Sequence, residues 1–226
     1  MRIGILQSGH FPEELVPETG TYPDMYATLL DGHGFTFQTW SVVDGVFPDG
    51  IDAADGWLVS GSRHGAYEDH DWIPPLEEFI RTAHAARKPM VGICFGHQII
   101  AQALGGKVIK FPSGWSVGPT QYDFGGETVA LNAWHQDQVV EVPEGARVLA
   151  STEFCANAAL AYGDTILTIQ PHPEFGKAAL DGLLRTRGHL LTDELLDRAR
   201  NALDTPTANR ETGRKIGEFF LRAREV

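Results

Sequence analysis

The chain has little cysteine and no long apolar run. Its 226 residues contain two cysteines, Cys94 and Cys155. Two cysteines in a chain of this size form no disulfide framework, and no cysteine–histidine cluster has the spacing of a zinc site. We therefore expect a reducing, cytoplasmic environment. No stretch approaches the ~18 consecutive apolar residues that cross a membrane, and the apolar run near the N-terminus is too short for the core of a signal peptide.

Positive charge is also scarce. The chain has 18 Lys and Arg against 30 Asp and Glu, which gives a formal net charge of −12 at pH 7. Nucleic acids and anionic membranes are bound by basic surfaces, so neither is an expected partner. The G-x-x-x-x-G-K-[ST] motif of ATP-binding phosphate loops is absent as well. The chain is therefore not expected to act alone as an ATP-dependent synthetase.

Apolar runs and helical patterns alternate in the first half of the chain. This alternation predicts a doubly wound, mostly parallel α/β sheet with helices on both faces, of the flavodoxin-like kind. The expected strands cover residues 3–7, 35–43, 56–60 and 90–93, and the expected helices cover 22–30, 74–86 and 98–104.

Short β-like runs dominate after Lys107 and predict a small antiparallel extension of the sheet. They cover residues 107–111, 128–131, 138–142, 147–150, 158–162 and 165–169. From about residue 177 the pattern is helical, and we expect the last helix to begin at Pro206 with Thr205 as its N-cap. No shift in composition marks a boundary, so residues 1–226 are expected to form one domain with a helical C-terminal extension over about 177–226.

Residues 91–98 read VGICFGHQ and place Cys94 in a sharp turn between an expected strand and an expected helix. In a parallel sheet, ligands bind at the carboxyl ends of the strands, where this turn lies. Gly92 and Gly96 stand two residues before and after the cysteine, as the tight backbone of a G-x-nucleophile-x-G elbow requires. The N-terminus of the following helix points at the thiol and favours the thiolate. The alternative reading is a buried structural cysteine between incidental glycines.

A histidine and a glutamate follow a later strand, in the run TIQPHPEF at residues 168–175. His172 precedes Pro173, which favours extended backbone, and side chains two apart on an extended chain project to the same side. Glu174 can therefore accept a hydrogen bond from the His172 imidazole and fix its tautomer. Alone, His-Pro-Glu is more typical of a surface loop. With the cysteine elbow, it predicts a nucleophile, a base and an orienting carboxylate.

With both motifs present, the sequence resembles the class I glutamine amidotransferase superfamily over roughly residues 1–180. In that family a G-x-C-x-G-x-Q elbow and a distal H-P-E supply a Cys-His-Glu triad. The matching stretches here are GICFGHQ at 92–98 and HPE at 172–174. The resemblance therefore implies that Cys94, His172 and Glu174 are the catalytic residues.

The resemblance also implies an oxyanion hole made of backbone N–H groups. One donor would be Phe95, next to the nucleophile, and the other would come from a glycine-rich turn after an earlier strand. Many relatives have two glycines and a proline where this chain has Gly61-Ser62-Arg63; we favour the N–H of Ser62, with Gly61 allowing the turn. The elbow glutamine and a stretch resembling the family's S-H-G-D-like loop would bind the glutamyl substrate. These residues are Gln98, His135, Gln136 and Asp137.

Within the superfamily, the chain resembles the stand-alone branch related to plant γ-glutamyl peptidases. The resemblance lies in stretches such as DHDWIPPLEEFI and GICFGHQIIAQALGGKV. It implies hydrolysis of a γ-glutamyl amide, either glutamine or a γ-glutamyl compound, through a thioester on Cys94. The products would be glutamate and ammonia or an amine. The expected ligand is a small γ-glutamyl molecule, and no metal or organic cofactor is expected.

Three other functions stay open at this point. The chain could be a glutaminase subunit that delivers ammonia to a separate synthetase. It could also be a non-catalytic binding module that kept the pocket. Its partner could be that synthetase or a second copy of the same chain. The related cysteine-elbow family of chaperone and deglycase-like proteins lacks the distal H-P-E and is disfavoured. Two other motif residues have no expected chemistry, since His97 faces away from the thiol and Cys155 is packed. Arg63, His64 and the acidic run at 68–71 are expected in a solvated loop at the pocket edge, where they could tune which substrate enters.

Overall fold

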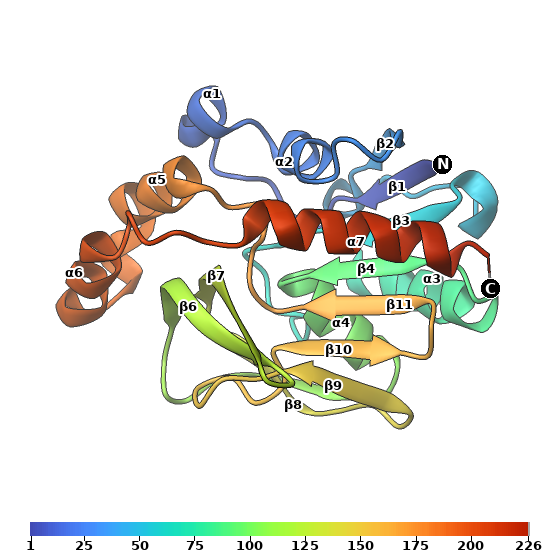
Figure 1. Ribbon diagram of the computed structural model, residues 1–226. Coiled ribbons are helices and arrows are strands. Elements are labelled where there is room, and N and C mark those ends of the chain that lie inside the picture. The colour runs from blue at the N-terminus through green and yellow to red at the C-terminus, as the bar shows by residue number, and fades with distance from the viewer. Residues whose placement is uncertain (226) are drawn as a thin grey trace.

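Parallel strands form the centre of the molecule and continue into an antiparallel edge (Figure 1). The computed structural model, which describes residues 1–225, has a seven-stranded sheet in the order β2-β1-β3-β4-β11-β10-β9. The first five of these strands are parallel, and β10 and β9 are antiparallel. This arrangement confirms the predicted fold class. The strands are β1 (Arg2–Leu6), β2 (Thr36–Trp40), β3 (Gly56–Val59), β4 (Met90–Ile93), β9 (Ala146–Ala150), β10 (Ala159–Tyr162) and β11 (Ile166–Ile169).

Helices cover both faces of the sheet because the strands β1, β3 and β4 are apolar on both sides. On one face, Ile3 and Ile5 pack with Tyr26 and Phe220. On the other face, Trp57 packs with side chains of two further helices. The first face is covered by α2 (Tyr22–Leu29) and α7 (Asn209–Ala223), and the second by α3 (Ile73–Ala85) and α4 (Phe95–Ala103).

Two helix starts follow directly from their sequences. Thr21 and Asp24 form a reciprocal capping box at the start of α2, in which each side chain accepts from the other's backbone N–H. Two prolines lie in the first turn of α3, where a backbone N–H has no partner within the helix. The apolar stripe of α3, with Leu76, Ile80 and Ala83, is buried as its spacing predicts.

Two small antiparallel sheets lie beside the main sheet, so the predicted extension is divided. β9 and β10 join the main sheet, whereas β5 (Lys107–Lys110) pairs with β8 (Asp137–Glu141). A long hairpin joins β6 (Ser116–Phe124) to β7 (Glu127–His135) through Gly125 and Gly126, which both have positive φ. The sequence reading missed β6, because Gly118 and Pro119 interrupt its β-like pattern.

The chain ends in three helices, α5 (Lys177–Arg187), α6 (Asp193–Asn201) and α7, and a short α1 (Val16–Thr19) lies near α5. The prediction that the last helix begins at Pro206 is wrong, since α7 begins at Asn209. Thr205 is not its N-cap, because its N–H donates to Ala202 and closes the turn after α6. The threonine cap belongs instead to α6, where the Thr192 side chain accepts from the Leu195 N–H.

The last helix crosses the face of the sheet in Figure 1 and is part of the core rather than a free tail. Phe220 is fully buried, and Gly213 and Gly217, one turn apart, bring α7 close to the end of α2. A Cβ on Gly213 would lie 2.3 Å from the Leu29 carbonyl oxygen.

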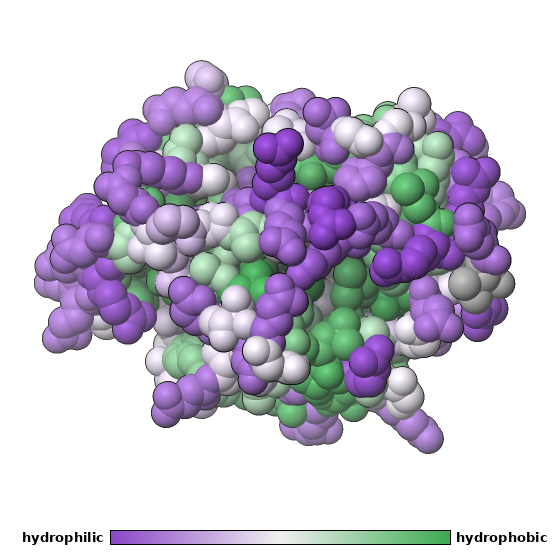
Figure 2. Space-filling view, in the orientation of Figure 1, coloured by the Kyte–Doolittle hydropathy of each residue, from purple (hydrophilic) through white to green (hydrophobic). Residues whose placement is uncertain are grey.

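Figure 2 shows polar side chains along the outer surface of α7 and an apolar area beside it over β9 to β11, where Val148 is exposed. In residues 1–225 no helix is both long and apolar enough to cross a membrane.

We expect Gly96→Ala to destabilise the fold strongly. A Cβ at this position would lie 2.1 Å from the Val59 carbonyl oxygen, so α4 would have to move away from β3. Overpacking of this kind costs about 1–3 kcal/mol or more, and thermal and urea unfolding measure it. Gly50→Ala is the matched control, because nothing lies within 4 Å of its Cβ position. Equal stability of the two variants would contradict the close packing.

Candidate active site

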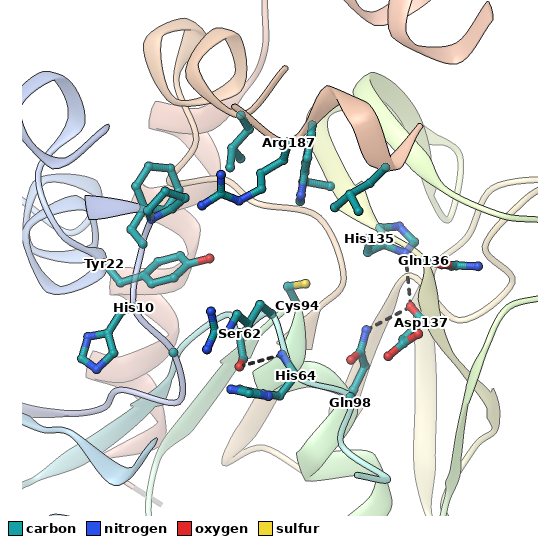
Figure 3. Close-up of a pocket in the computed structure, with 18 of the residues that line it drawn as sticks. His10, Tyr22, Ser62, His64, Cys94, Gln98, His135, Gln136, Asp137 and Arg187 are labelled. Atoms are coloured by element: carbon teal, nitrogen blue, oxygen red, sulfur yellow. Dashed lines mark hydrogen bonds between the residues drawn. The ribbon is translucent and has the colours of Figure 1, made fainter. Parts of the chain in front are cut away.

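Cys94 occupies the strained turn that its sequence predicts. It follows β4 and directly precedes α4, and its backbone has φ 54° and ψ −103°. Non-glycine residues rarely adopt such positive φ, which costs of order 1–3 kcal/mol and is found mainly at functional sites. The Cys94 N–H donates to the Ile169 carbonyl at 2.9 Å, which ties the turn to β11. The thiol consequently projects into a pocket at the carboxyl ends of the parallel strands (Figure 3).

The structure brings His172 and Glu174 to this cysteine. After β11 the chain bends, and the His172 N–H donates to the Asn132 carbonyl at 2.8 Å, while Pro173 and Glu174 form a turn that the Phe175 N–H closes on the His172 carbonyl. The His172 Nδ1–H donates to Glu174 Oε1 at 2.7 Å, and Cys94 is close enough to the His172 ring to raise its pKa. The imidazole stacks on Phe175, with ring centroids 4.0 Å apart. A buried line of contacts therefore runs from carboxylate to imidazole to sulfur.

Two neighbouring groups set the protonation of His172. Burial opposes a charge on the ring, but the sulfur of Cys94 and the carboxylate of Glu174 outweigh burial and raise the pKa of His172 to about 10. The buried His135, near the positive His172, responds in the opposite direction: burial first and then that charge lower its pKa to about 3. At neutral pH the site thus holds one charged histidine beside one neutral histidine.

Tyr26 supports Glu174, a contact that sequence reasoning missed. Its O–H donates to Glu174 Oε1 at 3.1 Å, so one carboxylate oxygen accepts from both the tyrosine and the histidine. Burial first, then the charge of Glu174, raises the pKa of Tyr26 well above its usual value, which keeps the phenol a donor. Tyr26 belongs to the apolar stripe of α2 and looked like an ordinary core residue. Only the tertiary fold places it beside a carboxylate 148 residues away.

Tyr26 also contacts the turn of the expected oxyanion hole. The Gly61 N–H donates to the Tyr26 hydroxyl at 3.1 Å, so this N–H is not free to stabilise an oxyanion. Gly61 is instead needed for its size, since a Cβ there would lie 3.1 Å from both the His172 ring and the Tyr22 hydroxyl. Ser62 lines the pocket, and Phe95 is the first residue of α4. Their N–H groups remain the predicted donors.

The expected substrate-binding residues meet in the same pocket. The Gln98 amide donates to the Asp137 carbonyl at 2.9 Å and to Gln170 Oε1 at 3.1 Å. His135 Nδ1 lies 3.2 Å from that same Asp137 carbonyl, while the Gln136 amide donates to the Phe111 carbonyl at 3.3 Å. These contacts form a tight reversal between β7 and β8 rather than an open loop. Gln98 thus holds the reversal against α4.

The pocket has a volume of about 630 Å³ and extends well beyond Cys94. Its far wall comes from α5 and the turn after it, where Arg187 pairs with Glu14 at 2.9 Å. Figure 3 shows Arg187 and Tyr22 across the pocket from Gln98 and Asp137. Arg63, His64 and Glu68, which were expected in a solvated loop, also line the pocket. Helix α5 and the turn after it therefore contribute directly to the cavity.

The remaining motif residues lie outside the pocket. His97 is fully buried on α4, with its Nδ1 2.8 Å from Thr168 Oγ1, and it faces away from the thiol as expected. Cys155 is buried, and burial raises its pKa to about 12. Neither residue is placed to act on a molecule in the pocket.

Comparisons with known proteins find relatives that span most of the chain. The family description "Glutamine amidotransferase class-I" matches residues 48–184. Gamma-glutamyl peptidase 3 of Arabidopsis thaliana is 32% identical over 92% of this chain and 92% of its own length. Gamma-glutamyl peptidase 4 of the same plant is 32% identical over 90% and 88%. The crystal structure of a glutamine amido transferase from Methylobacillus flagellatus shares the fold, with a TM-score of 0.78 at 22% identity over 99% of this chain and 92% of that one.

We expect Glu174→Gln to lower the pKa of His172. The carboxylate favours the charged imidazolium, so its removal leaves burial opposed only by Cys94. In the wild type His172 stays protonated until the pH rises through about 10, and in the variant the proton is lost at lower pH. An NMR titration of the His172 ring measures both values. Glu144→Gln, an exposed carboxylate away from the pocket, is the control. An unchanged or higher pKa in Glu174→Gln would contradict the assigned contact.

Proposed function

Because the chain belongs to the class-I glutamine amidotransferase family, we propose that it hydrolyses a γ-glutamyl amide bond through a thioester on Cys94. The observation that carries the proposal is the buried row of Cys94, His172 and Glu174 beside a large pocket, in which His172 is hydrogen-bonded to Glu174 and interacts with Cys94. A sulfur beside a charged imidazole is an activated nucleophile, and a buried carboxylate fixes the imidazole's orientation.

The reaction begins with attack by the Cys94 thiolate on the γ-carbonyl carbon of a glutamyl group. The carbonyl oxygen becomes an oxyanion, which the N–H groups of Ser62 and Phe95 stabilise. Loss of one such donor typically costs ~10²–10³ in rate. The strained backbone of Cys94 supports this step, because it exposes the sulfur beside the first N–H groups of α4.

The amide bond breaks when the leaving nitrogen takes a proton. His172 supplies that proton from Nε2, since its Nδ1–H is held by Glu174. The ammonia or amine leaves and a γ-glutamyl thioester remains on Cys94. Water, deprotonated by His172, then attacks the thioester carbonyl. This step releases glutamate and returns the thiolate and the imidazolium.

A γ-glutamyl compound with a bulky leaving group fits the pocket better than glutamine alone. A volume of about 630 Å³ lies in the range that binds a ligand of drug size. The aromatic side chains Trp115 and Trp134, with ring centroids 6.0 Å apart, line the pocket and offer packing surface for such a group. The relatives named gamma-glutamyl peptidases support the same substrate class.

We expect Cys94→Ala to abolish turnover and leave the fold intact. Wild type and variant are incubated with glutamine, glutathione and a panel of γ-glutamyl amides, and released glutamate is measured by mass spectrometry. Release from bulky γ-glutamyl compounds by the wild type alone supports the proposal. Near-normal release by Cys94→Ala would overturn it. If the wild type released glutamate only when a second protein was added, the chain would be an amidotransferase subunit instead.

We expect Glu174→Ala to slow the reaction less than His172→Ala does. His172 carries the proton in both steps, whereas Glu174 acts by orienting and charging it. The ratio of kcat/KM values for the two variants on one substrate measures the difference. Equal losses, or a larger loss for Glu174→Ala, would contradict these roles.

A further inference from the structure

The loop between β3 and α3 gathers three metal-ligating side chains at one edge of the pocket. His64, Glu68 and His70 each direct one ligand atom so that the three atoms lie within 4.8 Å of one another. His64 and Glu68 also line the pocket that holds Cys94. The reaction proposed above uses none of these three side chains.

The distances within this cluster suit a single coordination sphere. His64 Nδ1 lies 3.2 Å and His70 Nε2 lies 2.8 Å from the same oxygen, Glu68 Oε2. Ligand atoms around a tetrahedral zinc ion, bonded at about 2.0–2.2 Å, are separated by roughly 3.3 Å. Two of the three separations are therefore close to those around one ion, and the two histidine nitrogens lie within 4.8 Å of each other.

The surrounding contacts fix the cluster in place. The His70 ring lies parallel to the Trp72 ring, with centroids 5.9 Å apart, and Trp72 packs against Phe95 at the base of the elbow. The His64 N–H donates to Ser62 Oγ at 3.1 Å, as Figure 3 shows. The Glu68 N–H donates to the Gly65 carbonyl at 3.0 Å. These contacts fix the backbone of the loop and the ring of His70, so the three side chains start from neighbouring positions.

We propose that His64, Glu68 and His70 bind a divalent cation of the zinc type at the edge of the pocket. Two imidazole nitrogens and one carboxylate oxygen match the ligand preference of zinc and its neighbours, and three protein ligands leave a fourth position open. The exposed Asp69 and Asp71 add negative charge to the same loop and favour a cation there. Because His64 and Glu68 face the pocket, the open position is available to water or to a donor atom of a bound molecule.

The test is a calorimetric titration with zinc chloride in Cys94→Ala protein without an affinity tag. The substitution removes the thiol, which would otherwise bind zinc, and makes the measurement independent of hydrolysis. We expect one zinc ion per chain. We expect Glu68→Gln and His70→Ala, each added to Cys94→Ala, to weaken binding by at least about tenfold. Far-UV circular dichroism checks that each variant is folded, and the isosteric Glu68→Gln disturbs the loop least.

His84→Ala is the matched control, because His84 is an exposed histidine on the neighbouring α3, outside the cluster. It should leave the affinity unchanged. Absence of stoichiometric zinc binding would overturn the proposal. Equal affinity in Glu68→Gln, His70→Ala and His84→Ala would overturn it as well, because the three side chains would then serve only to hold the loop.

Discussion

The backbone of one residue, Cys94, is the constraint on which the site depends. Its positive φ is possible only because β4 and α4 hold the turn from both sides. Gly92 and Gly96 make this packing possible, since a Cβ on either would lie within 2.5 Å of a carbonyl oxygen. The strain has a cost, and the surrounding core of β3, β4 and α4 supplies the stability that offsets it. A closely packed part of the core therefore presents the reactive atom.

A single buried carboxylate organises the other half of the site. Glu174 Oε1 accepts from both Tyr26 and His172, and Tyr26 in turn accepts from the Gly61 N–H. This chain of contacts links α2, the turn after β3 and the segment after β11. In a buried setting such a charge is tolerated only with hydrogen bonds and a positive partner, and the imidazolium is that partner. A change at Tyr26 would thus reach the imidazole and the turn of the expected oxyanion hole together.

Local features of the sequence were enough to predict much of this arrangement. The elbow at Cys94 depends on neighbouring glycines, so its geometry could be read from a short stretch. The contact between His172 and Glu174 was predicted as well, but from extended backbone, whereas the chain turns at Pro173 and Glu174. The parallel sheet could be predicted as well, because the alternation of apolar runs and helical patterns is also visible in short stretches. Long-range features were missed: Tyr26 is a core tyrosine by pattern, and its role depends on a glutamate far along the chain.

The other wrong predictions concern local sequence patterns that long-range contacts in the fold override. Gly118 and Pro119 interrupt the β-like sequence pattern of β6. The strand forms nevertheless, because its pairing with β7 outweighs the poor strand propensity of these two residues. Thr205-Pro206 has the signature of a helix start, yet the chain uses it to finish the turn after α6. The loop at residues 63–71 has the composition of a solvated loop, and only its folding against Trp72 brings His64, Glu68 and His70 together.

The account rests on a covalent intermediate at Cys94, and acid-quenched intact-protein mass spectrometry tests it most directly. The enzyme is mixed with an excess of a γ-glutamyl amide, stopped within one turnover and weighed, and the modified peptide is then mapped. The account predicts a gain of one glutamyl group on the peptide that contains Cys94, and its loss on treatment with hydroxylamine. Glutamate release with no such adduct at any quench time, or an adduct on another residue, would contradict it.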